Sequence, residues 1–455
     1  MEMILEFLRD VLSQPALLIG IMSCVGLIAL KRPFHKIMTG TLKPILGYLM
    51  LAAGAGVIVS NLDPLGKMIE HRFHITGVVP NNEAIVAVAQ KVLGVETMSI
   101  LVVGLLMNLL IARFTKFKYV FLTGHHSLFM ACLMSAVLGT AGLSGIELIL
   151  VGGFLMGAWS AISPAIGQSY TSKVTDGDEI ALGHFGSLGY YLSAWVAKYV
   201  GKAEESTEDI EIPEKWGFLR DSTLSTALTM IVFYLIAAIA AGSEFVATLS
   251  GSMSPYLFAV MSAMNFAVGV AIVYSGVRMI LGDLIPAFQG IATKIIPNAI
   301  PAVDCAVFFT YAPTAVVLGF ISSFIGGIIG MLILGAVGGV LIIPGLVPHF
   351  FCGATAGIYG NATGGRRGAA VGAFLNGLAI TFLPALALPV LGQLGFQNTT
   401  FGDADFAVMG LVLGNAFEWI GMAGIYGVVV IAALVLIIPN FIKTKGKVIN
   451  YVEEE

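Results

Sequence analysis

Long runs of uncharged apolar residues constrain the fold of this chain more than any other feature. A transmembrane helix needs about 20 consecutive apolar residues. The clearest runs that approach or exceed this length are residues 15–30, 99–112, 120–139, 148–162, 227–241, 257–276, 305–347, 368–392 and 419–441. Only 11% of the residues are charged, whereas soluble domains carry about 25%. The sequence therefore predicts an all-α polytopic membrane protein with about ten to twelve transmembrane helices and re-entrant segments.

The few charged residues indicate orientation more than partners. Lys and Arg cluster at residues 31–43, 113–118, 198–202 and 443–447, and we expect these segments on the cytoplasmic side of the lipid bilayer. The first apolar run follows acidic residues and no basic segment, so we expect no cleaved signal peptide. No basic stripe suggests nucleic acid as a partner.

One long polar stretch, residues 171–222, divides the chain. The sequence predicts a first transmembrane repeat at 1–170, an interfacial segment and cytoplasmic loop at 171–222, a second repeat at 223–441 and a polar tail at 442–455. The halves share three ordered matches, which begin at Lys43 and Arg278, Pro80 and Pro301, and Tyr119 and Tyr359. Because transporters often contain inverted repeats with the substrate site between them, we expect two inverted repeats here.

Acidic residues inside apolar segments are candidates for binding. An ionised carboxylate at bilayer depth costs about 2.5–3.5 kcal/mol on insertion scales, so Asp304, within Ile300-Pro-Ala-Val-Asp-Cys305, needs a compensating role. It could accept hydrogen bonds from substrate hydroxyl groups, or it could cap a helix that starts near Pro301. Glu83 is its counterpart beside Pro80 and has the same two interpretations.

Three histidines lie near predicted segment ends. His125 and His184 are candidate ligands of a hydroxylated substrate, because an imidazole both donates and accepts hydrogen bonds. His126 is adjacent to His125 and is expected to face lipid headgroups instead, since neighbouring helical residues point apart. No histidine pair has the i, i+4 spacing of a zinc site, so we expect no metal and no cofactor. Residues 350–357 resemble a re-entrant tip that would present the Thr355 hydroxyl.

Several ordered motifs resemble one family. Residues 43–56, Thr123-Gly-His-His126, residues 174–184 and Ala302-Val-Asp-Cys-Ala306 are together similar to the IIC subunit of ascorbate phosphotransferase systems (PTS). The segments 202–209 and 342–345 extend the likeness, which runs from about residue 1 to about residue 441.

The resemblance implies a homodimer in the bacterial inner membrane. Each protomer would have a core domain that holds the sugar and a V-shaped dimerisation domain, with transport by movement of the core. A separate IIB protein, charged through IIA and HPr, would phosphorylate the sugar, so that this chain is a permease subunit without catalytic residues of its own. His125, His184 and Asp304 look like ascorbate-contacting positions, with backbone near Gly54 and Thr355.

The sequence departs from that family at the implied site. Phe185 and Phe129 stand where glutamines are expected, Asn82-Glu83 replaces Thr-Tyr, and Ala52 and Ala55 replace polar residues. Aromatic faces suit stacking on a sugar ring, and Glu83 adds an acceptor. A site built for particular hydroxyl groups discriminates against ligands that lack them, so the departures bear on the substrate more than on the fold.

Three functions therefore stay open from the sequence. The first is a IIC permease for L-ascorbate or a related sugar acid, and the second is the same permease for another pentose or pentitol. The third is an ion-coupled secondary transporter that would use Asp304 and Glu83 as ion sites. A membrane-bound enzyme is disfavoured, because no nucleophile and base arrangement is found.

Overall fold

The computed structural model describes residues 10–11, 14–73, 78–80, 82–177, 179–210, 222–392 and 399–441. Its helices and strands are α2 (Pro15–Ala29), α3 (Phe34–Phe73), β1 (Val79–Pro80), α4 (Asn82–Phe114), β2 (Tyr119–Phe121), α5 (Gly124–Thr140), α6 (Gly145–Val174), β3 (Ala181–Leu182), α7 (Ser187–Val200), α8 (Ser222–Ala241), α9 (Ser243–Ser250), α10 (Pro255–Lys294), β4 (Ile300–Val303), η2 (Cys305–Thr310), α11 (Pro313–Ala336), α12 (Leu346–Gly392), β5 (Thr399–Thr400), α13 (Ala404–Ile420), α14 (Met422–Ile437) and η3 (Ile438–Phe441).

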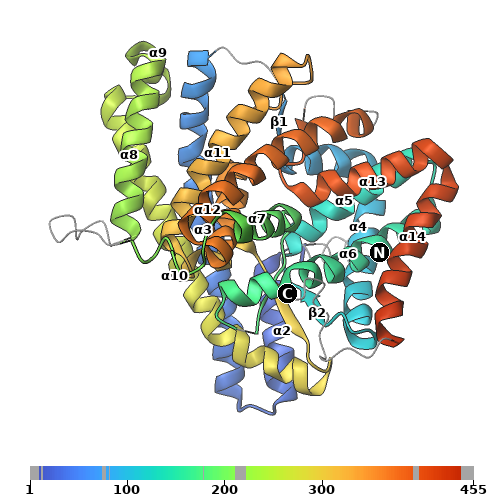
Figure 1. Cartoon of the computed structure of the whole chain (residues 1–455). Helices are drawn as coiled ribbons and strands as arrows, with labels where there is room; N and C mark the ends of the chain where they lie inside the picture. The colour runs from blue at the N-terminus through green and yellow to red at the C-terminus, as the bar shows by residue number, and fades with distance from the viewer. Residues whose placement is uncertain are drawn as a thin grey trace.

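The architecture is all-α and polytopic, as predicted. Within the described residues, seven helices are long and apolar enough to cross a membrane. An eighth crossing is possible if the pair Met230–Ala241 and Ser243–Ser250, bent by 117°, forms one span. The predicted number of ten to twelve stays a prediction. In Figure 1, α8 and α9 lie on the left of the view and α4, α6 and α14 on the right, with α12 between them.

The two halves repeat the same order of elements. α10 follows α3 at a distance of 221 residues and has the same length of 40 residues. β4 likewise follows β1, and β5 follows β3, at similar distances. α5 and α6 correspond to the two parts of α12, which is kinked at Gly364 and Gly365. The predicted boundaries at 170, 222 and 441 stay predictions, since residues 211–221 and the tail at 442–455 lie outside the described part.

Glycines bring α3 and α10 into close contact. A Cβ on Gly47 would lie 2.8 Å from the carbonyl oxygen of Gly276, and a Cβ on Gly54 would lie 2.7 Å from that of Gly269. Small residues allow helix backbones to approach this closely. Because residue numbers rise along one helix as they fall along the other, the two helices are antiparallel, as inverted repeats require. Gly54 therefore packs a helix pair.

Short parallel strands join the halves. β4, from the second half, lies between β2 and β3 of the first, while β1 of the first half pairs with β5 of the second. A further bridge joins Val78 to Ile342 and repeats the β4–β2 pairing. Since parallel strands end at the same edge, the residues that follow them converge, and the core at this edge receives side chains from both halves.

The structure corrects parts of the sequence interpretation. The match between Pro80 and Pro301, 221 residues apart, makes β1 and β4 equivalent strands of the two repeats. Tyr119 lies in β2 but Tyr359 lies inside α12, so that match was wrong. The bridge at Ile342, 221 residues after Phe121 of β2, takes the place of β2 in the second half. The predicted tip at 350–357 also lies inside α12, which breaks at Gly364 and Gly365. Hydropathy alone could not separate a buried helix from a re-entrant tip.

Candidate functional site

A cavity of about 680 Å³ opens where the strand ends of the two halves meet. This volume is typical of small-molecule sites, which measure about 300–1,000 Å³. Five of the predicted residues line it: Asn82, His125, Phe129, His184 and Asp304. The structure adds further polar residues that the sequence interpretation did not assign to the site: Tyr48, His126, Cys305, Cys352 and Asp403.

Asp304 caps a helix and also lines the cavity. It directly follows β4 and caps the 3-10 helix η2, where its Oδ1 accepts a hydrogen bond from the backbone N–H of Ala306 at 3.0 Å. Its other oxygen, Oδ2, lies 3.5 Å from Nε2 of His125. The Tyr48 hydroxyl lies 3.4 Å from Nδ1 of His125 on the opposite side of the ring. The cap thus fixes the carboxylate and leaves one oxygen directed at the cavity.

His184 is held by its own loop after β3. The backbone N–H of Gly186 donates to Nδ1 of His184 at 3.1 Å, and the Tyr190 hydroxyl lies 2.9 Å from the same atom. A nitrogen that accepts an N–H carries no hydrogen, so in a neutral ring the hydrogen is on Nε2. His184 therefore presents a donor through Nε2.

His126 is buried at the cavity wall and does not face lipid, contrary to prediction. Its exposed fraction is 4%, and its Nδ1 accepts the backbone N–H of Phe185 at 3.3 Å. Its ring centroid lies 3.8 Å from that of His184, and its ring is nearly parallel to that of Phe406. The prediction failed because His125 and His126 both lie in the first turn of α5, where two neighbouring side chains can border one cavity at the helix end.

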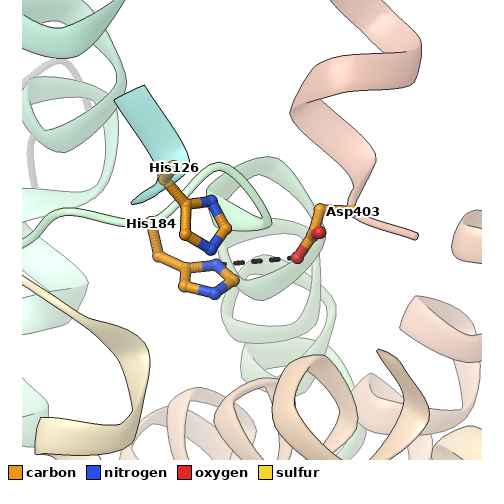
Figure 2. A group of neighbouring side chains, drawn as sticks. All are labelled: His126, His184 and Asp403. Carbon is orange, nitrogen blue, oxygen red and sulfur yellow. Dashed lines mark ion pairs between the residues drawn. The ribbon is translucent and has the colours of Figure 1, made fainter. Parts of the chain in front are cut away.

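Asp403 was missed by the sequence interpretation. It follows β5 and is 5% exposed. Asn82 Nδ2 donates to its Oδ2 at 2.6 Å, and the Cys352 thiol donates to its Oδ1 at 3.0 Å. Nδ1 of His184 lies 3.8 Å from Oδ1, beyond hydrogen-bond distance (Figure 2). Its place after β5, equivalent to that of His184 after β3, is the signal that a correct repeat alignment would have given.

Asp405 holds the loop that carries His184. Its carboxylate accepts hydrogen bonds from the Ser187 hydroxyl at 2.7 Å, the Leu188 backbone N–H at 2.9 Å and Trp159 Nε1 at 3.2 Å. Its own N–H donates to the Phe185 carbonyl oxygen at 2.9 Å. Asp405 thus satisfies orphan donors at the start of α7 and ties α7 to α13.

The other predicted site residues lie elsewhere or are not described. Phe185 is fully buried and stacks on Phe121, with ring centroids 4.6 Å apart, so it does not line the described cavity wall. The Thr355 hydroxyl donates to the Phe351 carbonyl oxygen at 2.8 Å within α12. The side chains of Glu83 and Ala55 lie outside the described part of the structure.

The cavity wall carries more negative than positive charge. Asp304 and Asp403 lie in its interior, and both come within 4.8 Å of a nitrogen of His184. Among the described lining residues, Lys67 is the single lysine or arginine, and its Nζ lies 2.7 Å from Asp63 in an exposed pair. The described interior therefore has no permanent cation to balance its two carboxylates.

Two overlapping groups could in principle hold a metal ion. His184 belongs to both, with His126 and Asp403 in one (Figure 2) and with Asp304 and Cys305 in the other. However, Nδ1 of His126 and of His184 accepts a backbone N–H. Ligation through Nε2 would place the ring hydrogen on Nδ1, against that N–H. The arrangement fits hydrogen-bond donation better than metal ligation, and the expected absence of a metal stays a prediction.

Comparison with known proteins identifies related sequences. The family described as "PTS system sugar-specific permease component" (EIIC-GAT) matches residues 10–405. The "Ascorbate-specific PTS system EIIC component" of Mycoplasma pneumoniae (strain ATCC 29342 / M129 / Subtype 1) is 26% identical over 416 residues, which cover 78% of this chain. The match covers 62% of that relative, so the chain spans less than two thirds of its length.

Proposed function

Because the chain belongs to the family of PTS system sugar-specific permease components, we propose that it binds a small carbohydrate in this cavity and carries it across the bacterial inner membrane. The observation that carries the proposal is the convergence of polar side chains from both halves in a cavity of about 680 Å³ within a polytopic helical protein. Transporters with repeats often bind substrate at the repeat interface.

The cavity can satisfy a hydroxylated ligand from several sides. Nε2–H groups of His126 and His184 are donors, and the carboxylates of Asp304 and Asp403 are acceptors. Each carboxylate oxygen accepts more than one hydrogen bond, so the internal bonds to Asn82 and Ala306 leave capacity for a ligand. Phe129 supplies an apolar surface at the same wall. Mixed donors, acceptors and one aromatic face suit a sugar or polyol.

Two substrate candidates follow. The relative from Mycoplasma pneumoniae is ascorbate-specific by its description, which makes L-ascorbate or a related sugar acid the first candidate. A pentose or pentitol is the second candidate, because two residues of the cavity differ from those that the sequence resemblance leads us to expect. Phe129 stands in place of a glutamine and Asn82 in place of a threonine.

Phosphorylation would come from outside this chain. A separate IIB protein, supplied through IIA and HPr, would transfer a phosphoryl group to the bound sugar at the cytoplasmic face. The helices α2, α3, α8, α9 and α10 contact one another far more than they contact the remaining helices. This grouping supports a homodimer with a scaffold of these helices and a core that moves against it.

Uptake coupled to phosphorylation tests the proposal. The chain is produced in cells that lack their own permease for the sugar, with IIA and IIB proteins present or absent, and radiolabelled sugar inside the cells is separated into free and phosphorylated forms. We expect phosphorylated sugar to accumulate only when the chain and the phosphotransfer proteins are both present. Its absence for every carbohydrate tested would contradict the proposal.

Ion coupling is the second candidate, favoured by the buried carboxylates of Asp304 and Asp403. Intramembrane acids often mark ion pathways. A secondary transporter would accumulate unmodified sugar without IIA or IIB and would stop when an ionophore dissipates the proton or sodium gradient. The same uptake experiment therefore separates the two functions.

A further inference from the structure

We propose that Asp403 is a second specificity-determining carboxylate, and that Asp304 and Asp403 together select an uncharged polyhydroxy ligand over a sugar acid. This inference rests on the proposed function, because it concerns the ligand that the permease carries. It favours the second substrate candidate, an uncharged pentose or pentitol, over the first, L-ascorbate or a related sugar acid.

The first step is the charge of the cavity. An ionised sugar acid such as L-ascorbate at neutral pH would enter a space whose interior holds two carboxylates. The single lysine or arginine among the described lining residues is Lys67, which is already paired with Asp63 in an exposed ion pair. Asp304 and Asp403 each have a carboxylate oxygen within 4.8 Å of a ring nitrogen of His184. Proteins use like-charge contacts of this kind to exclude wrong partners.

The second step is the state of the histidines. A protonated imidazole could balance an anion, but a protonated ring donates from both nitrogens. Nδ1 of His126 faces the Phe185 N–H at 3.3 Å, and Nδ1 of His184 faces the Gly186 N–H at 3.1 Å. A second hydrogen on either Nδ1 would oppose that backbone donor. The backbone thus favours neutral rings, which supply hydrogen-bond donors without positive charge.

The third step is how Asp403 is fixed. Asn82 donates to one oxygen at 2.6 Å and Cys352 to the other at 3.0 Å, while Asn82 itself accepts the Gly402 N–H at 2.9 Å. A carboxylate held by neutral donors keeps its negative charge uncompensated. Hydroxyl groups of a polyol can donate to its remaining lone pairs, whereas a ligand carboxylate or enolate cannot.

Isothermal titration of the purified full chain in detergent tests the inference. The panel contains xylitol, ribitol and D-xylose as uncharged ligands and L-ascorbate and L-gulonate as anions, all at neutral pH. We expect at least one uncharged ligand to bind the wild type about tenfold or more tightly than both anions, a preference equal to about 1.4 kcal/mol. Tighter binding of either anion, or no binding by any panel member, would overturn the inference.

Charge-removing variants identify the residue responsible. Asp403→Asn should reduce the preference for uncharged ligands several-fold, because it weakens an acceptor for hydroxyl groups and removes repulsion from anions. Asp304→Asn should act in the same direction, which keeps the inference testable if Asp403→Asn fails to fold. Glu204→Gln is the matched control, since Glu204 is exposed and does not line the cavity. An unchanged preference in both cavity variants would refute the role of the carboxylates.

The result is independent of the test of transport. If the cells accumulate phosphorylated L-ascorbate and the purified chain prefers that anion, the inference fails and the PTS function stands. If uncharged ligands bind preferentially but uptake never depends on IIA and IIB, the PTS function fails and the inference stands.

Discussion

In the first half of the chain β3 is followed directly by Gly183 and His184, and in the second half β5 is followed by Phe401 and then by Gly402 and Asp403. Both glycines let a loop pass close to a neighbouring segment, which belongs to the other half at Gly183 and to the same half at Gly402. A Cβ on Gly183 would lie 2.4 Å from the Ala302 carbonyl oxygen, whereas one on Gly402 would lie 2.7 Å from a Pro348 side-chain carbon. The comparison teaches that strand pairing sets the place of the next side chain and leaves its chemistry free.

The residues that follow the equivalent strands β1 and β4 also differ in chemistry. β1 leads to Asn82, which bonds to Asp403, and β4 leads to Asp304, which approaches His125. Each contact joins one half to the other. One end of the cavity is therefore an amide and a carboxylate, while the other is an imidazole and a carboxylate.

The largest expected effect is a difference in stability between the alanine variants of Gly183 and Gly402. Gly183→Ala should destabilise the protein by about 3 kcal/mol, near the upper end for overpacking of a tight interior, because its methyl group meets backbone that is fixed by the β3–β4 pairing. Gly402→Ala should cost about 1 kcal/mol, since the contact is one side chain. The measurement is the thermal unfolding midpoint of both variants in the same detergent. Equal midpoints would break the comparison.

Asp304→Asn tests the end of the cavity formed by Asp304 and His125, through its effect on ligand binding. We expect binding of the tightest panel ligand to weaken about tenfold to a hundredfold, as hydrogen bonds to a charged group are worth about 1.5–3 kcal/mol. Membrane insertion should be retained, because removal of a charge eases burial. Titration of the purified variant measures the loss. Asp283→Asn is the control, since Asp283 pairs with Lys43 at 3.5 Å and does not line the cavity; unchanged binding by Asp304→Asn would argue against its role.

Asn82 variants test the other end. Asn82→Ala should lower stability by about 1–2 kcal/mol, because it leaves the Gly402 N–H and an oxygen of Asp403 without their partner. Asn82→Asp should place two carboxylates in contact, so the loss should be large at neutral pH and should diminish as the pH falls and one of them binds a proton. Unfolding midpoints across a pH series measure both. A pH-independent midpoint for Asn82→Asp would contradict the contact.

Tyr48→Phe should have the smallest effect. The Tyr48 hydroxyl lies 3.4 Å from Nδ1 of His125, which is long for a hydrogen bond. Its removal should weaken ligand binding by less than about threefold, equal to about 0.6 kcal/mol. Titration with the same ligand tests this, and a larger loss would show that the hydroxyl contacts the ligand directly.

Part of the site was predictable from single residues. Asp304, His125 and His184 stood out because polar groups are costly in apolar segments, and all three line the cavity. Asp403 and Cys352 gave no such signal, because their roles depend on partners far away in the chain: Asp403 bonds to Asn82, 321 residues before it, and Cys352 bonds to Asp403, 51 residues after it. Phe185 was expected at the ligand but stacks on Phe121, since the direction of a loop side chain depends on the strand that precedes it.

The sequence by itself determined the all-α polytopic class, since long uncharged runs without the alternation of barrel strands can satisfy their backbone polar groups in a bilayer by forming helices. It also predicted a duplicated order of elements, for which the Pro80 and Pro301 match has the register that the structure shows. The tertiary structure decided the register of that repeat and the convergence of the strand ends. Pairing between β4 and β3 and between β1 and β5 is non-local, and such contacts leave no periodic pattern in the chain. They alone brought Asp403 to His184.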